Sequence, residues 1–319
     1  MEKIGILIET NNGEIKAANF GVITAARKNG NELYAFVLDC TGNDCEKQLQ
    51  EYGIKAVITI TSPRGAIKWH PVLWAGAIES AMKHFGINTL FGLTSAKGKD
   101  LLPRIAADLD APLVMDCIKV NPAEHTAEKP QFSGKTIATI KVKGSHYLFG
   151  IRPNAIEAVP APCKAETIVF QTEVASKRMT VETLRQGPSR GVELSEAAIV
   201  ISGGRAMANT ENFNLLKQCA ETMGAAVGAS RAVVDAGWVP HTMQVGQTGT
   251  TVSPKVYIAC GISGSVQHFA GMKTSDFIIA VNTDPEASII TKCDYYVIAD
   301  LFKIVPLLTS RLKDALGRS

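Results

Sequence analysis

The chain has 319 residues, of which 46% are hydrophobic and 20% are charged, and its formal net charge is +3. This length is enough for two domains of ordinary size, and the composition is typical of a globular protein with a full core. Lysines and arginines are scattered along the chain, which argues against the basic stripe of a nucleic-acid-binding protein.

The seven cysteines have irregular spacing and form no C-x-x-C pair. This pattern argues against a disulfide framework and against a zinc site, so we expect reduced cysteines and no metal. No apolar stretch reaches the ~20 residues of a membrane span. The N-terminus resembles a strand rather than a targeting peptide. We therefore expect a cytoplasmic, bacterial protein.

The first half alternates apolar runs with amphipathic helical patterns. Strands are predicted at residues 4–8, 32–38, 56–60 and 89–93, and helices at 17–28, 44–52, 71–84 and 101–109. Such alternation predicts a mainly parallel sheet with helices on both faces. Residues 136–153 alternate with a period of two, which predicts an antiparallel hairpin added to this sheet.

A connection between two domains is predicted at residues 159–191, which contain prolines at both ends and no long apolar run. We place the boundary near residues 186–191. The predicted domains are 1–188 and 189–319.

The second half repeats the α/β pattern. Strands are predicted at residues 197–201, 225–229, 256–260, 277–281 and 295–298, and helices at 210–223 and 300–316. This order predicts a doubly wound, Rossmann-like fold, in which a ligand lies at the carboxyl ends of the strands.

Small, amide or charged residues follow each of these five strands. They are Gly203, Gly204 and Arg205; Ser230 and Arg231; Gly261, Ser263 and Gly264; Asn282 and Asp284; and Asp300. Glycine lets a backbone approach phosphate closely, and a helix N-terminus offers free N–H groups. One such strand end is ordinary turn chemistry, but five in one domain favour a shared, dinucleotide-like ligand.

Residues 235–254 form a long glycine-rich segment with little apolar periodicity. Gln244, Gln247 and Thr248 supply amide and hydroxyl groups there, and Gly246 and Gly249 allow a tight backbone. Long segments of this kind are either functional or mobile surface loops, and both interpretations stay open on the residues alone.

Residues 228–272, "GASRAVVDAGWVPHTMQVGQTGTTVSPKVYIACGISGSVQHFAGM", resemble the flavin-binding domain of the electron transfer flavoprotein (ETF) alpha subunits. "AVNTDPEASII" and "ADLFKIVPLLTSRL" extend the resemblance over residues 197–312. The first half resembles the family more weakly, through "RIAADLDAPLVMDC" and "GIRPNA".

The resemblance implies an FAD-carrying subunit of a heterodimer with an ETF beta subunit. It would take electrons from dehydrogenases, such as the acyl-CoA dehydrogenases of fatty acid beta-oxidation, and pass them to a membrane ETF:quinone oxidoreductase. The first domain would pack on the beta subunit and bind no nucleotide of its own. The beta subunit would hold AMP or a second FAD.

The resemblance also assigns residues to parts of FAD. Arg205, Ser230 and Asn282 would contact its adenosine and phosphate side, and Asp300 and Leu301 would close over the adenine. The pyrophosphate and ribityl chain would be held by Ser263, Gly264, Ser265, Val266 and Gln267. The isoalloxazine would be lined by Gln244, Val245, Gly246, Gln247 and Thr248, with Arg231 over the ring and His268 at the pyrimidine carbonyl.

An electron carrier needs no general base or nucleophile, so no catalytic residue is expected. It needs positive charge or hydrogen-bond donors where the reduced ring gains negative charge. Arg231, Thr248 and His268 are the expected redox-tuning residues, and His268 can respond because a histidine ordinarily titrates near neutrality. The structural alternatives are a surface ion pair for Arg231 and a carbonyl-bonded helix-start residue for His268.

Three other functions stay open. An electron-bifurcating ETF would differ only in the partner chain. A self-contained flavin or nicotinamide oxidoreductase would need a substrate pocket with an acid or base, which the sequence does not supply. A nucleotide-sensing module would bind the cofactor without redox chemistry.

Overall fold

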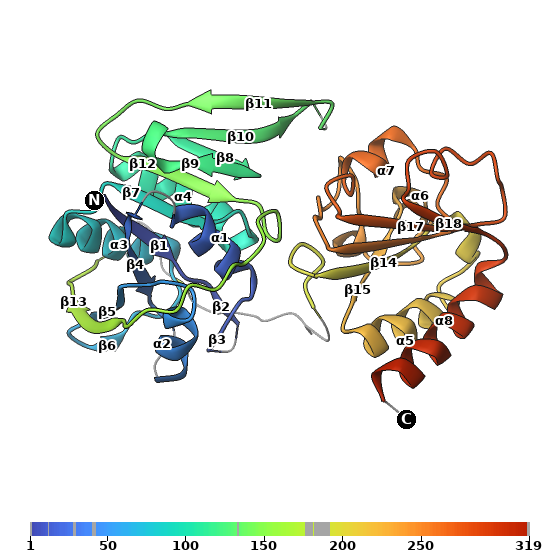
Figure 1. Cartoon of the computed structure of the whole chain (residues 1–319), viewed down its shortest axis with the longest axis horizontal. Helices are drawn as coiled ribbons and strands as arrows, with labels where there is room; N and C mark the ends of the chain where they lie inside the picture. The colour runs from blue at the N-terminus through green and yellow to red at the C-terminus, as the bar shows by residue number, and fades with distance from the viewer. Residues whose placement is uncertain are drawn as a thin grey trace. The chain divides into compact units, whose positions relative to one another are not determined.

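The computed structural model describes residues 2–11, 13–27, 30–39, 43–132, 134–175, 181 and 192–317. The chain divides into two compact units (Figure 1), one of residues 1–131 with 137–185 and the other of residues 132–136 with 186–319. The domain boundary predicted between residues 188 and 189 lies outside the described residues and stays a prediction.

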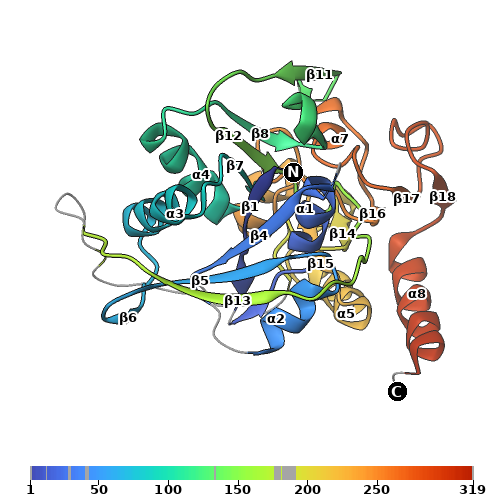
Figure 2. The ribbon, with the colours of Figure 1, turned by 60° about the vertical axis from the view of Figure 1, so that its left-hand side comes forward.

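The first unit is built on a parallel sheet with the strand order β13-β5-β4-β1-β7-β12-β8. Figure 2 shows β13, β5, β4 and β1 side by side. The strands are β1 (Lys3–Leu7), β4 (Glu32–Val37), β5 (Ala56–Ser62), β7 (Thr89–Leu93), β8 (Leu113–Cys117), β12 (Tyr147–Ile151) and β13 (Glu166–Gln171). A short strand, β6 (Gly65–Ala66), pairs antiparallel with β5, and β2 (Thr10–Asn11) pairs with β3 (Glu14–Ile15).

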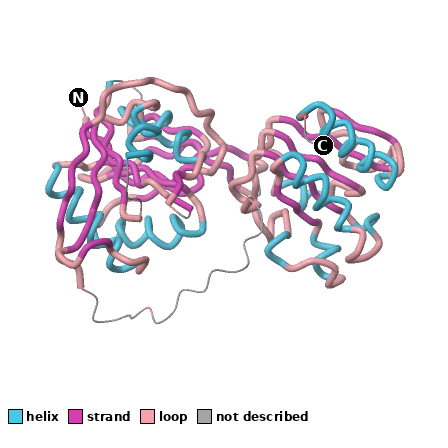
Figure 3. Tube along the Cα trace, turned by 90° about the horizontal axis from the view of Figure 1, so that it is seen from below, coloured by secondary structure: helices cyan, strands magenta, loops and turns pink. Residues whose placement is uncertain are grey.

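Helices cover both faces of this sheet, as predicted (Figure 3). The helices α1 (Ala18–Ala26) and α2 (Asn43–Gln50) pack into one apolar cluster, and α3 (Pro71–Phe85) and α4 (Ala96–Asp108) pack into the other. Helix α4 begins five residues earlier than predicted because the Ser95 hydroxyl accepts a hydrogen bond from the backbone N–H of Gly98 and caps the helix.

The predicted hairpin at residues 136–153 is wrong. Its first half is β11 (Thr136–Lys141), which joins β10 (Thr126–Gln131) and β9 (Lys119–Asn121) in a separate three-stranded sheet. Its second half is β12, which lies between β7 and β8 and pairs parallel with both. The apolar run "YLFGI" is buried almost throughout, as a central parallel strand requires.

The predicted interdomain connection also contains a strand that we did not expect. Strand β13 pairs parallel with β5 at the edge of the sheet, with Glu166 opposite Ala56. Its residues are at most half-buried, so its sequence lacks the apolar run that identifies a central strand.

The second unit contains a five-stranded parallel sheet with the order β15-β14-β16-β17-β18. The strands are β14 (Ile199–Gly203), β15 (Ala226–Ala229), β16 (Val256–Cys260), β17 (Phe277–Asn282) and β18 (Tyr295–Ile298). In chain order this is 2-1-3-4-5, one of the two common doubly wound orders. The predicted α/β class with mainly parallel sheets is confirmed.

Helices α5 (Phe213–Met223) and α8 (Leu301–Leu316) pack on one face of this sheet, where Phe213, Leu216 and Val305 are buried. The other face has its own apolar cluster, which includes Tyr257, Ala280 and Ile289, and the short helix α7 (Val266–Ala270) packs against it through Phe269. Another short helix, α6 (Arg231–Asp235), follows β15 and was not predicted.

Across the ranges that the structure describes, no helix is both long and apolar enough to cross a membrane. The cysteine prediction needs a correction, because Cys45 in α2 is disulfide-bonded. Free thiols are found at Cys117, Cys163, Cys219, Cys260 and Cys293.

Candidate functional site

The candidate site lies where the strand order of the second unit reverses, between β14 and β16. At this switch point two neighbouring strands send their chains to opposite faces of the sheet, which leaves a crevice at their carboxyl ends. The two ends touch each other directly, because the Gly204 N–H donates to the Cys260 carbonyl (2.8 Å). A side chain on Gly204 would overlap the Gly261 carbonyl, so glycine is required for this approach.

The "GISG" loop after β16 is anchored by contacts with the chain around residues 289–292. Gly264 has a left-handed backbone (φ +80°), and a Cβ there would lie 2.5 Å from the Ile289 backbone nitrogen. Ile289 donates to the Ser263 carbonyl (3.0 Å), and the Lys292 ammonium donates to the Gly264 carbonyl (2.8 Å). These bonds occupy the carbonyl oxygens of Ser263 and Gly264 and anchor the loop to residues 289–292.

The "VGQTG" segment is tied to the same edge, so the interpretation as a mobile loop does not apply to this stretch. The Val245 N–H donates to Ala229 at the end of β15 (2.9 Å), and the Gln247 N–H donates to the Gln267 carbonyl in α7 (2.9 Å). The Gln244 side-chain amide donates to the Thr248 hydroxyl (2.9 Å). Two segments that are twenty residues apart in the sequence therefore meet at one surface.

Exposed side chains surround this surface. Ser263, Ser265, Val266 and Gln267 are exposed in the loop and in the first turn of α7, and Gln247 and Thr248 are exposed beside them. The Ser265 hydroxyl caps α7 by accepting from the His268 N–H (3.4 Å). Helix α7 has five residues, so backbone N–H groups rather than a helix dipole are the donors available for a phosphate.

Arg205, Ser230 and Arg231 lie at the ends of the two neighbouring strands. The Ser230 N–H donates to the Gly203 carbonyl (3.0 Å), which joins the ends of β15 and β14. Arg231 is 66% exposed and its Nε lies 3.2 Å from an Asp235 carboxylate oxygen. An exposed ion pair of this kind contributes about 0.2–1 kcal/mol, so the guanidinium can leave Asp235 for a ligand at little cost.

Asn282, Asp300 and Leu301 have evident structural roles at the same edge. The Asn282 amide donates to the Ile262 carbonyl (3.0 Å). Asp300 caps α8 by accepting from the Phe302 N–H (2.9 Å), and Leu301 is buried against Gly261. These residues shape the crevice from the side of β17 and β18.

His268 is the one predicted site residue that is a buried titratable group. It is 5% exposed, and burial lowers the pKa of its imidazole to about 4. The ordinary imidazole pKa near neutrality, from which we expected His268 to respond to the flavin, therefore does not apply to this buried ring. The Val245 carbonyl opposes the shift, but no described residue lies in hydrogen-bonding geometry with Nδ1.

Two polar residues near His268 were missed from the sequence. The Tyr257 hydroxyl lies 3.0 Å from His268 Nε2, and Ser202 is fully buried one strand away. Both project from strands whose other residues are almost all apolar, "VYIAC" and "IVISG". A polar side chain at an inward position of such a strand is the signal that could have identified them.

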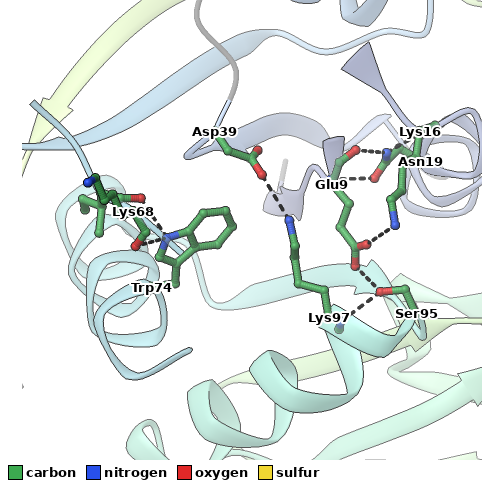
Figure 4. Close-up of polar contacts among 10 residues, drawn as sticks. Glu9, Lys16, Asn19, Asp39, Lys68, Trp74, Ser95 and Lys97 are labelled. Carbon is green, nitrogen blue, oxygen red and sulfur yellow. Dashed lines mark hydrogen bonds and ion pairs between the residues drawn. The ribbon is translucent and has the colours of Figure 1, made fainter. Parts of the chain in front are cut away.

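The equivalent crevice of the first unit is filled by the protein's own carboxylate. The strand order β5-β4-β1-β7 reverses between β1 and β7. Glu9 follows β1 and is 1% exposed, and the Ser95 hydroxyl after β7 donates to it (2.5 Å). Lys16 pairs with the same carboxylate (3.2 Å), and the Asn19 amide binds the Glu9 carbonyl (2.8 Å), as Figure 4 shows.

No cluster of three histidine, cysteine, aspartate or glutamate side chains with metal-binding geometry is present in the parts of the chain that the structure describes.

Two family models match the chain. One, described as the electron transfer flavoprotein domain, matches residues 4–186, and the other, described as the electron transfer flavoprotein FAD-binding domain, matches residues 193–273. A solved structure of Acinetobacter baumannii MurG aligns with 99% of this chain and 84% of its own chain at 10% identity. Its TM-score of 0.31 is too low to indicate a shared fold.

Curated relatives named electron transfer flavoprotein subunit alpha match over almost the full length. The protein from Syntrophomonas wolfei is 35% identical over 97% of this chain and 98% of its own length. The Bacillus subtilis protein is 35% identical over 98% of both chains. The Pseudomonas aeruginosa protein is 36% identical over 95% of this chain and 97% of its own.

Proposed function

Because the chain belongs to the electron transfer flavoprotein alpha-subunit family, we propose that its second unit binds one FAD at the switch point between β14 and β16. The observation that carries the proposal is the assembly of five strand ends and the "VGQTG" segment at one edge, held by the Gln247–Gln267 and Gly204–Cys260 hydrogen bonds. The residues that we predicted to bind the cofactor end these strands, follow them or belong to this segment, which supports the proposal.

The residues present fit a flavin dinucleotide. Glycines at positions 204, 261 and 264 let the strand ends and the loop after β16 pack against neighbouring protein atoms at distances that a Cβ would not allow. The closely packed backbone at this edge could donate N–H groups to a phosphate. The buried Nδ1 atom of His268 has no partner among the described residues, and a buried polar atom of this kind is satisfied when a ligand supplies one.

We assign the parts of FAD to the residues as follows. Ser263, Gly264, Ser265, Val266 and Gln267 hold the pyrophosphate and ribityl chain. Arg205, Ser230 and Asn282 bind the adenosine and phosphate side, with Asp300 and Leu301 over the adenine. Gln244, Val245, Gly246, Gln247 and Thr248 line the isoalloxazine.

FAD supplies the redox chemistry when it is bound, and the protein tunes it. Arg231 places a mobile positive charge at the ring, and Thr248 places a hydroxyl there. His268 acts as a neutral hydrogen-bond donor, because its lowered pKa keeps the imidazole uncharged at neutral pH. All three favour negative charge on the ring.

The first unit packs on a beta subunit in this proposal and binds no nucleotide. The Glu9 carboxylate lies beside Ser95 at the start of α4, where a phosphate would otherwise be held. A second negative charge in this position would repel Glu9. Any further nucleotide, AMP or a second FAD, belongs to the beta subunit.

The heterodimer carries electrons in the cytoplasm from dehydrogenases, such as acyl-CoA dehydrogenases, to a membrane quinone oxidoreductase. To test this, the chain is co-expressed with the beta chain encoded nearest to it, and FAD is released by acid and measured. We expect one FAD per alpha chain and reduction by an acyl-CoA dehydrogenase with its substrate. A flavin-free complex, or NAD(P)H turnover by the chain alone, would overturn the proposal.

A further inference from the structure

Tyr257 and His268 form an isolated polar pair inside an apolar face of the second unit. Tyr257 lies in the middle of β16 and is fully buried among Val200, Ala226 and other apolar side chains. Its hydroxyl is 3.0 Å from His268 Nε2, and the two rings meet edge to face with centroids 6.1 Å apart. The contact therefore sets the orientation of the imidazole ring.

Both members of the pair are uncharged at neutral pH. Burial raises the pKa of the Tyr257 hydroxyl far above its ordinary value, and burial lowers the pKa of His268 to about 4. One hydrogen therefore lies between Oη and Nε2, and it belongs either to the phenol or to the imidazole. If the phenol donates to Nε2, the imidazole carries its hydrogen on Nδ1, and if the imidazole donates to Oη, it carries its hydrogen on Nε2.

The surroundings favour the arrangement in which the phenol is the donor. The Val245 carbonyl interacts with the imidazole, and a carbonyl can only accept a hydrogen bond. A hydrogen on Nδ1 is attracted by that carbonyl, whereas an Nδ1 lone pair would be repelled by it. The Ser202 hydroxyl lies near the phenol but outside hydrogen-bonding geometry, so His268 is the better acceptor for the phenol.

We propose that Tyr257 is a positioning residue that holds His268 in the neutral tautomer with its hydrogen on Nδ1 and thereby presents a fixed N–H to the bound flavin. The inference rests on the proposed FAD site. Preorganised donors stabilise developing negative charge without reorganisation, and a neutral donor does so without a counter-charge. The Nδ1 atom completes no hydrogen bond to the nearby Val245 carbonyl, and Val245 belongs to the segment that we assign to the isoalloxazine.

The tautomer can be measured directly by nitrogen NMR on the full chain labelled with ¹⁵N-histidine, at pH 7, both free of FAD and as the FAD-loaded complex with its beta subunit. The His268 signals are assigned by their loss in His268→Gln. In the wild type we expect the hydrogen on Nδ1. Tyr257→Phe removes one hydroxyl and keeps the ring, and we expect the preference for the Nδ1 tautomer to fall about tenfold, as loss of one buried hydrogen bond implies.

Two further variants identify the source of the effect. Tyr296→Phe removes an exposed hydroxyl from β18 and should leave the His268 signals unchanged. Ser202→Ala should also leave them unchanged. If Ser202→Ala removes the preference and Tyr257→Phe does not, or if the wild-type hydrogen is on Nε2, the inference is wrong.

The flavin potential tests the second half of the inference. In the loaded complex we expect Tyr257→Phe to shift the potential to a more negative value, with FAD content unchanged. An unchanged potential despite an altered tautomer would overturn the role toward the flavin. A wild-type complex without FAD would instead refute the proposed function, while the spectra of the flavin-free chain would still decide whether Tyr257 sets the tautomer.

Discussion

Burial of His268 predicts that the second unit loses stability as the pH falls. The pKa of this imidazole is about 4 in the folded chain and about 6.5 when exposed, so between these values the unfolded chain binds one more proton. The stabilisation is fully present above pH 6.5 and is lost toward pH 4. Between pH 7.0 and 4.5 this single group removes about 2.5 kcal/mol from the free energy of unfolding.

Hydrogen exchange can measure this loss without interference from the first unit. The exchange of β16 amides is followed by mass spectrometry at both pH values on the FAD-free chain, because a bound ligand adds its own linkage. In His268→Gln we expect the pH-dependent loss to be smaller by about 2.5 kcal/mol, since carboxylates that titrate in the same range cancel in the comparison. The control His241→Gln, at an exposed site in the same unit, should behave as the wild type. A difference below about 1 kcal/mol between His268→Gln and the wild type would refute the reasoning.

Gly264→Ala should weaken FAD binding at least about tenfold, because the added Cβ meets the Ile289 backbone. In the control Gly237→Ala, where φ is +73° and the added Cβ has no neighbouring atom within 4 Å, we expect a cost of only about 1–2 kcal/mol of backbone strain and unchanged FAD binding. Glu9→Gln breaks a buried ion pair with Lys16 and should lower the free energy of unfolding of the first unit by about 3 kcal/mol in urea denaturation. The control Glu79→Gln breaks an exposed ion pair with Lys83 and should lower the same free energy by less than about 0.5 kcal/mol. Arg231→Ala and Thr248→Ala should each shift the flavin potential by about 30–60 mV to more negative values with the fold intact. The control Arg311→Ala, on α8, should leave the potential unchanged. An unchanged potential in both Arg231→Ala and Thr248→Ala would contradict the assigned ring environment.

The second unit was predictable from the sequence almost element by element, because each central strand is an apolar run followed by glycine or a small polar residue. Strand β16 was predicted at residues 256–260, and the structure gives it the same bounds. What the pattern could not contain is the pairing of Tyr257 with His268. Their contact depends on how far α7 folds back over the sheet, which is set by tertiary packing.

The first unit was less predictable, for two physical reasons. Strand β13 lies at an edge and is half-exposed, so it carries no apolar run. The period-two pattern of residues 136–153 belongs to β11 alone, and β12 joins strands that are far from it in the sequence. The carboxylate of Glu9 was also missed, since a single glutamate after a strand gives no sign that it will be buried.

The order of the strands in the first unit has a consequence for synthesis of the chain. Strand β8 is made before β12, yet β12 lies between β8 and β7, so β8 has no place in the sheet until β12 has emerged. Strand β13 then closes the edge of β5, with Glu166 pairing with Ala56, about 110 residues earlier. Pairings of such high contact order form slowly. Until the ribosome has passed residue 171, the nascent chain exposes an open apolar edge, which makes this unit the one that most needs protection by chaperones.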